Sequence, residues 1–238
     1  MEGEKKMIIA LNHKSNFNQE EFLNYQEEFK KIQTDHTMIL CPSTIHLAQG
    51  KTSSIFLGAQ NVSAYEKGAY TGEVSAEQLK SYGVSYCIVG HSERRQYQKE
   101  TNEEIGIKIT RLFQNGIIPI LCIGESKEER EEARVKEVLQ EELEMATRNL
   151  TEEERNNLII AYEPIWSIGT GIIPTNDEIH EVFDFIKGLF PNTKVLYGGS
   201  ANEQNIEELK QVKTIDGYLL GGLSLHPDKL KLFLDRLN

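Results

Sequence analysis

A glutamate at the end of a strongly apolar run is the residue in this chain best placed to do chemistry. Glu163 follows the run 158–162, which predicts a buried strand, and a loop containing Gly169 and Gly171 comes next. A carboxylate at the C-terminal end of a strand can serve as a general base, and the loop can close over it as a lid. A single strand-end glutamate more often caps a helix or pairs with a lysine. The residues at the other strand ends must therefore show whether Glu163 is catalytic.

An amide and an amine follow the first apolar run, 7–12. Side chains alternate along a strand, so Asn12 and Lys14 share one side while His13 points away. A lysine and an amide on one side can hold an anion and an oxyanion, although a solvated Lys14 is the simpler alternative. His13 could be a base, but the alternation favours a packing or interface role for it.

His91 stands at the end of a fourth apolar run, 86–90, and Ser92-Glu93 resembles the start of a short helix. The positive end of a helix disfavours imidazolium, so a neutral His91 could donate a hydrogen bond to a carbonyl. No second histidine lies nearby at the spacing of metal ligands, which disfavours a metal role.

Glycine pairs end the last two apolar runs. They stand in Gly198-Gly199-Ser200 and in Gly221-Gly222, each before a helix-like segment. Exposed backbone N–H groups at helix starts bind phosphate, and the loops after strands 7 and 8 of a (β/α)8 barrel are a frequent phosphate site.

These residues must be positioned by an alternating series of strands and helices. The predicted strands are 7–12, 37–41, 54–60, 86–90, 118–124, 158–163, 194–198 and 217–220. The predicted helices are 19–34, 42–49, 75–82, 102–114, 127–149, 177–189, 206–213 and 227–237. Strict alternation predicts parallel strands with helices outside them, and eight units in this length favour one α/β domain over 1–238, a closed (β/α)8 barrel. A doubly wound sheet is the second possibility.

Composition narrows the class of protein. The 238 residues are 39% hydrophobic and 26% charged, which is ordinary for a globular chain. A net charge of −11 argues against nucleic-acid binding but permits an anionic substrate in a locally positive site. There is neither a signal-peptide core nor an apolar span long enough for a membrane helix, and the expected localisation is cytoplasmic. Cys41, Cys87 and Cys122 lie in apolar runs, which predicts reduced, packed thiols; a nucleophilic Cys122 is the alternative.

Eight sequence motifs together resemble the triosephosphate isomerase family. They are Asn12-x-Lys14, Ala59-Gln60-Asn61, Tyr70-Thr71-Gly72-Glu73, Gly90-His91-Ser92-Glu93-Arg94-Arg95, Cys122-Ile123-Gly124-Glu125, the run 161–171, Tyr197-Gly198-Gly199-Ser200 and Gly221-Gly222. The resemblance covers nearly the whole chain. It implies a TIM barrel that interconverts dihydroxyacetone phosphate and glyceraldehyde 3-phosphate in glycolysis and gluconeogenesis, without metal or cofactor.

The resemblance also implies a role for each matching residue. Glu163 takes a proton from the carbon next to the carbonyl. Neutral His91 polarises the carbonyl oxygen and shuttles protons between the two oxygens of the enediolate. Lys14 supplies positive charge, Asn12 holds the oxyanion, and Glu93 pairs with Lys14. The implied substrate-binding residues are Asn12, Lys14, Gly169, Ser200, Gly221 and Gly222. The implied lid is Ile165, Trp166, Ser167, Ile168, Gly169, Thr170 and Gly171, which docks onto Tyr197 and Ser200.

The family is typically homodimeric, with the loop after the third strand inserted near the partner's first-strand lysine. Thr71 would then reach the neighbouring site, and Glu73 could pair with Arg94 across the interface. The chain departs from the family pattern at His13 and Ser15, expected near the dimer interface, at Ile172-Ile173-Pro174 in the lid hinge, and at Leu223.

Three alternatives stay open. One is an isomerase of a related phosphosugar such as erythrulose phosphate. A second is a non-catalytic phosphate-ligand binding protein on the same barrel, and a third is an indole-type or ribulose-phosphate barrel enzyme that shares the phosphate loops.

Overall fold

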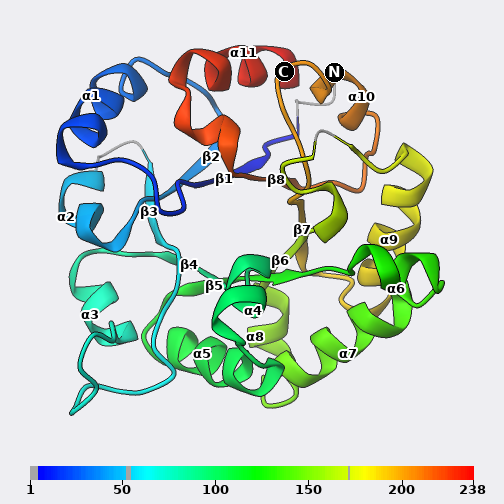
Figure 1. The fold of residues 1–238 in the computed structure, drawn as a ribbon, viewed down its shortest axis with the longest axis horizontal. Helices are drawn as coiled ribbons and strands as arrows, with labels where there is room; N and C mark the ends of the chain where they lie inside the picture. The colour runs from blue at the N-terminus through cyan, green and yellow to red at the C-terminus, as the bar shows by residue number, and fades with distance from the viewer. Residues whose placement is uncertain (1–4, 52–54, 171) are drawn as a thin grey trace.

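Eight parallel strands close into a barrel, and helices surround it on the outside (Figure 1). The computed structural model describes residues 5–51, 55–170 and 172–238. The strands are β1 (Ile8–Asn12), β2 (Thr37–Cys41), β3 (Phe56–Ala59), β4 (Tyr86–Val89), β5 (Ile118–Ile123), β6 (Ile159–Tyr162), β7 (Lys194–Tyr197) and β8 (Gly217–Leu220). Each pairs with the next along the chain, and β8 pairs with β1. The predicted (β/α)8 fold is therefore confirmed.

The helices alternate with these strands. The α-helices are α1 (Gln19–Phe29), α2 (Leu47–Gly50), α3 (Ala76–Ser81), α4 (Ser92–Gln98), α5 (Asn102–Gln114), α6 (Lys127–Glu131), α7 (Val135–Thr147), α8 (Glu152–Asn157), α9 (Asn176–Leu189), α10 (Ile206–Leu209) and α11 (Pro227–Leu237). Three 3₁₀ turns are also described: η1 (Thr44–His46), η2 (Ile165–Ser167) and η3 (Gly222–Leu225). No helix in the described part of the chain is long and apolar enough to cross a membrane.

Several predicted helices are wrong in their extent. The helix predicted at 19–34 ends at Phe29, the one predicted at 206–213 ends at Leu209, and the one predicted at 42–49 is η1 followed by α2. The segment 127–149 is two helices, α6 and α7, because the chain turns at Ala133, whose φ of 56° lies in the left-handed region. A non-glycine residue rarely adopts this conformation, so the sequence carries no glycine signal for the break. The predicted strand 54–60 is shorter in the structure, and its first residue, Ser54, lies outside the described residues.

Strand alternation divides the apolar side chains into two layers. Ala10, Ile39, Cys122 and their neighbours fill the barrel interior, whereas Ile9 and Leu11 pack outward against the helices. The barrel is therefore closed by side chains rather than hollow. Cys41, Cys87 and Cys122 are free and buried, and burial raises the pKa of the Cys122 thiol well above its ordinary value. A packed thiol, rather than a nucleophile, is what the structure shows at Cys122.

Candidate active site

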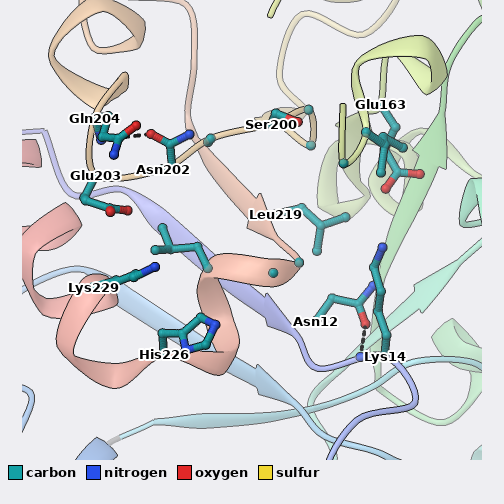
Figure 2. A pocket seen from close by; sticks show the side chains of 18 of the residues that line it. Asn12, Lys14, Glu163, Ser200, Asn202, Glu203, Gln204, Leu219, His226 and Lys229 are labelled. Atoms are coloured by element: carbon teal, nitrogen blue, oxygen red, sulfur yellow. Dashed lines mark hydrogen bonds between the residues drawn. The ribbon is translucent and has the colours of Figure 1, made fainter. Parts of the chain in front are cut away.

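A cavity of about 500 Å³ opens where the C-terminal ends of the strands meet. Figure 2 shows Asn12, Lys14 and Glu163 at one end of it and Asn202, His226 and Lys229 at the other. The lining comprises Asn12, Lys14, His91, Glu163, Ile168, Gly169, residues 198–204, Leu219, residues 221–223, His226 and Lys229. Residues predicted from five different strand ends are thus brought to one cavity, as parallel strands in a barrel require.

Lys14 is held in a strained backbone conformation directly after β1. Its φ is 52°, which is uncommon for a residue with a side chain. The side chain of Asn12 accepts a hydrogen bond from the Lys14 N–H at 3.0 Å, and the Gln60 amide donates to the Lys14 carbonyl at 2.9 Å. These bonds, one to the N–H and one to the carbonyl of the same residue, hold the ammonium group toward the cavity.

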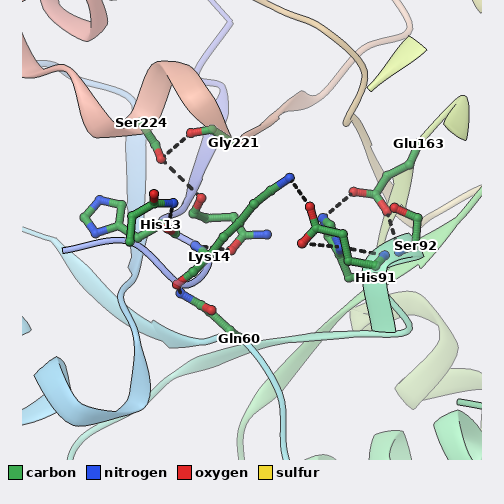
Figure 3. A network of polar contacts seen from close by, with 11 residues as sticks. His13, Lys14, Gln60, His91, Ser92, Glu163, Gly221 and Ser224 are labelled. Carbon is green, nitrogen blue, oxygen red and sulfur yellow. Dashed lines mark hydrogen bonds and ion pairs between the residues drawn. The ribbon is translucent and has the colours of Figure 1, made fainter. Parts of the chain in front are cut away.

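Lys14 and Glu93 form the predicted pair, with Nζ and Oε1 2.5 Å apart (Figure 3). Glu93 lies in the first turn of α4, and His91 is the residue that caps this helix. The His91 Nδ1 accepts the Glu93 backbone N–H at 3.3 Å, which leaves Nε2 as the ring nitrogen that can carry the proton. This geometry is the one expected for an imidazole at a helix start.

Glu163 is almost completely buried and faces His91. Its Oε1 lies 3.0 Å from the His91 Nε2, and its Oε2 accepts the Ser92 N–H at 3.2 Å (Figure 3). Burial acts to raise the pKa of Glu163, but His91, the Ser92 N–H and Lys14 together leave it lowered. Burial acts to lower the pKa of His91, but the Glu163 carboxylate leaves it raised. In this arrangement Glu163 therefore opposes the expected neutral state of His91.

Glycines form part of the cavity wall. A Cβ on Gly222 would meet no atom within 4 Å, so a ligand can approach this backbone closely. Gly221 precedes η3, and a Cβ there would lie 3.2 Å from the Lys14 Cε. Ser200 follows Gly199 on the loop after β7 and lines the same cavity. The predicted binding residues from three loops, including Gly169 of the lid, therefore face one space.

The predicted lid segment begins with η2, and this first turn is anchored to the barrel. The Trp166 Nε1 donates to the Glu125 Oε1 at 2.8 Å, and Arg130 donates to the same oxygen at 2.8 Å. The Ser200 hydroxyl donates to the Ser167 carbonyl at 2.5 Å, which is the predicted contact between lid and loop. Gly171, the last predicted lid residue, lies outside the described residues.

His13 packs inside its own subunit. It is 0% exposed, and its ring lies 4.6 Å from that of Tyr25 and 5.1 Å from that of Phe17. The packing interpretation is confirmed, whereas a direct contact between His13 and a partner chain is excluded by this burial. Ser15 is exposed.

Two residues of the site were not predicted as functional. Gln60 supports Lys14, and Glu125 anchors the lid; both were noted only as parts of motifs. Each is a polar residue one or two positions after a strand, which is the signal that could have found them. Among the described residues, no group of three or more His, Cys, Asp or Glu is arranged to hold a metal ion.

Taken together, the barrel and its cavity define the class of an acid–base enzyme for a small phosphorylated substrate. A buried carboxylate, an imidazole and an ammonium group converge in this cavity, and open glycine backbone also lines it. The chain matches the family model described as triosephosphate isomerase over residues 7–237. It is 44% identical to the triosephosphate isomerase of Gloeothece citriformis over 233 residues, with 94% of this chain and 95% of that protein covered.

Other relatives have the same name. The chain is 39% identical to the triosephosphate isomerase of Clostridium tetani over 238 residues, covering 94% of this chain and 93% of that protein. It is 38% identical to that of Dictyoglomus turgidum over 239 residues, covering 94% and 96%. The chain belongs to the triosephosphate isomerase family.

Proposed function

We propose that this protein interconverts dihydroxyacetone phosphate and D-glyceraldehyde 3-phosphate by proton transfer through an enediolate. The observation that carries the proposal is the convergence of Glu163, His91 and Lys14 in a cavity that Gly221 and Gly222 also line. The name shared by the relatives supports the same reaction. A four-carbon phosphosugar such as erythrulose phosphate is the alternative substrate.

The residues divide the reaction between them. Glu163 takes the proton from the carbon next to the carbonyl, and the electron pair moves to the carbonyl oxygen. The His91 Nε2–H donates to that oxygen, while Lys14 and Asn12 stabilise its developing negative charge. His91 also moves the hydroxyl proton of the enediolate from one oxygen to the other, and return of the proton from Glu163 to the neighbouring carbon then completes the isomerisation. Proton transfers alone balance this reaction, so the proposal includes no metal or cofactor.

The geometry described above is a resting state for this chemistry. Glu163 contacts His91 and Ser92, and these contacts lower its pKa and therefore its basicity. To reach a carbon acid the carboxylate must leave them, which also removes the charge that raises the pKa of His91. Neutral imidazole beside a carboxylate base, with closure of the lid excluding water, is the known pattern of this enzyme family.

In the same cavity the backbone N–H groups of Gly221 and Gly222, with Ser200 and with Gly169 of the closed lid, bind the phosphate. Gly169 has a φ of 70°, a conformation that suits glycine, and a Cβ at this position would meet no atom within 4 Å. The carbon skeleton then lies between the phosphate and Glu163, where water exclusion protects the enediolate from losing phosphate.

The test is conversion of glyceraldehyde 3-phosphate by the wild type, by Glu163→Gln and by Glu152→Gln, an exposed control on α8. Loss of a general base lowers kcat by about 10²- to 10⁴-fold. We expect this loss in Glu163→Gln and none in Glu152→Gln. Wild-type protein that is folded but prefers erythrulose phosphate would instead support the four-carbon alternative, and an inactive wild type would contradict the proposed reaction.

We further propose a homodimer. The loop between β3 and α3 exposes Tyr65 and Tyr70, 53% and 45% accessible, with rings stacked 4.2 Å apart. Two large exposed rings on one loop suit insertion into a partner. Thr71, at the same loop, would reach the neighbouring site. Light scattering should give twice the chain mass, and Thr71→Arg should give the monomer.

We also propose that the protein is cytoplasmic, because its three free, buried thiols suit a reducing compartment. Fractionation of the source cells with an antibody to the protein would test this, and recovery with secreted material would contradict it.

A further inference from the structure

The guanidinium of Arg95 joins the ends of two strands behind the active site. Its Nε donates to the Gly90 carbonyl at 2.7 Å, and its Nη2 donates to the Cys122 carbonyl at 3.2 Å. Gly90 follows β4 and precedes His91, while Cys122 lies at the end of β5. One planar group therefore sets the spacing between the β4 and β5 ends, because its N–H groups have fixed directions.

Glu142 completes this arrangement from outside the barrel. It lies on α7, is only 8% exposed, and its Oε1 is 3.3 Å from the Arg95 Nη1. Its Oε2 accepts the backbone N–H of Gly124 at 2.9 Å. The carboxylate thus bridges Arg95 to the residue that follows β5, so both strand ends are attached to one helix side chain.

Gly124 contacts the backbone of the proposed base. A Cβ on Gly124 would lie only 1.7 Å from the Glu163 carbonyl oxygen, so the two backbones are in close contact there. The Glu163 N–H in turn donates to the Ile123 carbonyl at 2.8 Å. A shift of the 123–124 peptide, which Glu142 holds, must therefore shift Glu163.

We infer that Glu142 and Arg95 are positioning residues that hold Glu163 and His91 in reacting geometry, and that the ionised carboxylate of Glu142 is required for full turnover. The inference rests on the proposed function, because it concerns placement for that reaction. Neither residue lines the cavity. Displacements of about 1 Å by residues away from the reacting atoms can cost about 100-fold in rate, so the effect belongs mainly in kcat.

The charge state of Glu142 makes the inference testable. Burial raises its pKa to about 7, against the opposing effects of Arg95 and the Gly124 N–H. The other charged groups that face it are Glu129 of α6 and Glu163, and both raise its pKa further. The Cys122 thiol of β5 is a titratable neighbour whose own pKa is well raised. Glu142 therefore changes charge within the pH range in which activity is measured.

The experiment compares kcat and KM of the wild type and Glu142→Gln from pH 6 to pH 8. Glutamine has the same shape, keeps an acceptor for the Gly124 N–H and has no charge. Glu141→Gln, at the adjacent exposed position of α7, is the matched control. Because the substrate phosphate titrates in this range for every variant, the ratio of wild-type to variant kcat at each pH is the readout.

We expect that ratio to be about tenfold at pH 8 and to approach one at pH 6, where wild-type Glu142 is itself neutral, with KM changed less than about threefold. Glu141→Gln should give a ratio of one throughout. A ratio for Glu142→Gln that is the same at every pH would overturn the inference, since a purely structural role has no such pH dependence.

If Glu142→Gln does not fold, Glu142→Asp is the variant that tests the inference. It keeps the negative charge on a side chain that is one methylene shorter. Lowered kcat with a retained ionisation would support positioning, and wild-type kcat at all pH values would overturn it. Activity lost in Glu163→Gln together with a pH-independent ratio for Glu142→Gln would overturn this inference alone. A wild type without isomerase activity would overturn both it and the proposed function.

Discussion

His13 should make the protein acid-sensitive. Its imidazole is 0% exposed and lies among the rings of Phe17, Phe22 and Tyr25. Burial lowers its pKa from 6.5 to about 4, with smaller opposing influence from the Ser224 backbone and a further lowering by His46. The perturbation to make is His13→Phe, which keeps an aromatic ring in the cluster and removes the titrating group.

The sign and size of the effect of pH on the free energy of unfolding follow from proton linkage. The unfolded chain takes up a proton at position 13 below about pH 6.5, whereas the folded chain resists until about pH 4. The stability contributed by neutral His13 is therefore complete above pH 6.5 and is lost as the pH falls toward 4. Between pH 7.5 and pH 5 the loss from this one group is about 2 kcal/mol.

The assay is urea unfolding of the wild type and His13→Phe at pH 7.5, 6.5, 5.5 and 5.0. His226→Asn, at an exposed histidine, is the control. Carboxyl groups elsewhere in the chain also titrate in this range. The quantity of interest is therefore the difference between variants in how steeply the free energy of unfolding changes with pH. We expect the wild type and His226→Asn to lose about 2 kcal/mol more than His13→Phe over this range.

Equal slopes for the wild type and His13→Phe would refute the reasoning, because they would mean that the folded and unfolded chains bind protons at position 13 with the same affinity. A lower stability of His13→Phe at pH 7.5 would not bear on the point, since it would report the fit of a larger ring.

Three further predictions test the site. Gln60→Ala should lower kcat/KM about 10-fold or more by steady-state assay, because it removes a bond of about 1 kcal/mol to the Lys14 carbonyl and frees a strained backbone. Glu125→Gln should weaken the hydrogen bond that anchors Trp166 and shift the tryptophan fluorescence. Trp166 is the only tryptophan of the chain, so this signal reports on the predicted lid alone, and an unchanged spectrum with unchanged kcat would contradict the anchoring role. Gly222→Val should raise KM about 10-fold or more while the urea midpoint is unchanged, because its side chain would enter the cavity rather than the core; an unaltered KM would argue against phosphate binding there.

Much of the fold could be predicted because local signals and burial agree. The helices 102–114 and 227–237 have their predicted bounds, as α5 begins after the Thr101 cap and α11 begins with Pro227. The break at Ala133 could not be predicted, since alanine favours helix and carries no signal for the left-handed φ that it adopts here. The helix α1 ends at Phe29, five residues before its predicted end, although the polar segment that follows carries no clear stop signal.

Only the site residues that stand at strand ends could be predicted from the sequence. Asn12, Lys14, His91 and Glu163 stand at strand ends, so a closed barrel necessarily brings them to one face. Their supporting partners come from elsewhere in the chain. Glu142 lies on α7, outside the barrel. Its hydrogen bond to Gly124 depends on how α7 is aligned along β5, which no local pattern specifies.

Pro164 joins the proposed base to the proposed lid segment. The Glu163 carboxylate makes contacts that lower its pKa. The first turn of the proposed lid, η2, begins at Ile165. Pro164 separates them, and its ring restricts φ to near its value here of −61°. In the proposed mechanism, a movement of η2 toward the phosphate cannot use the Pro164 φ torsion and must use the torsions on either side of it, among them those of Glu163. In the proposed mechanism the carboxylate leaves His91 and Ser92 as the lid closes, so the base becomes stronger when the substrate is enclosed.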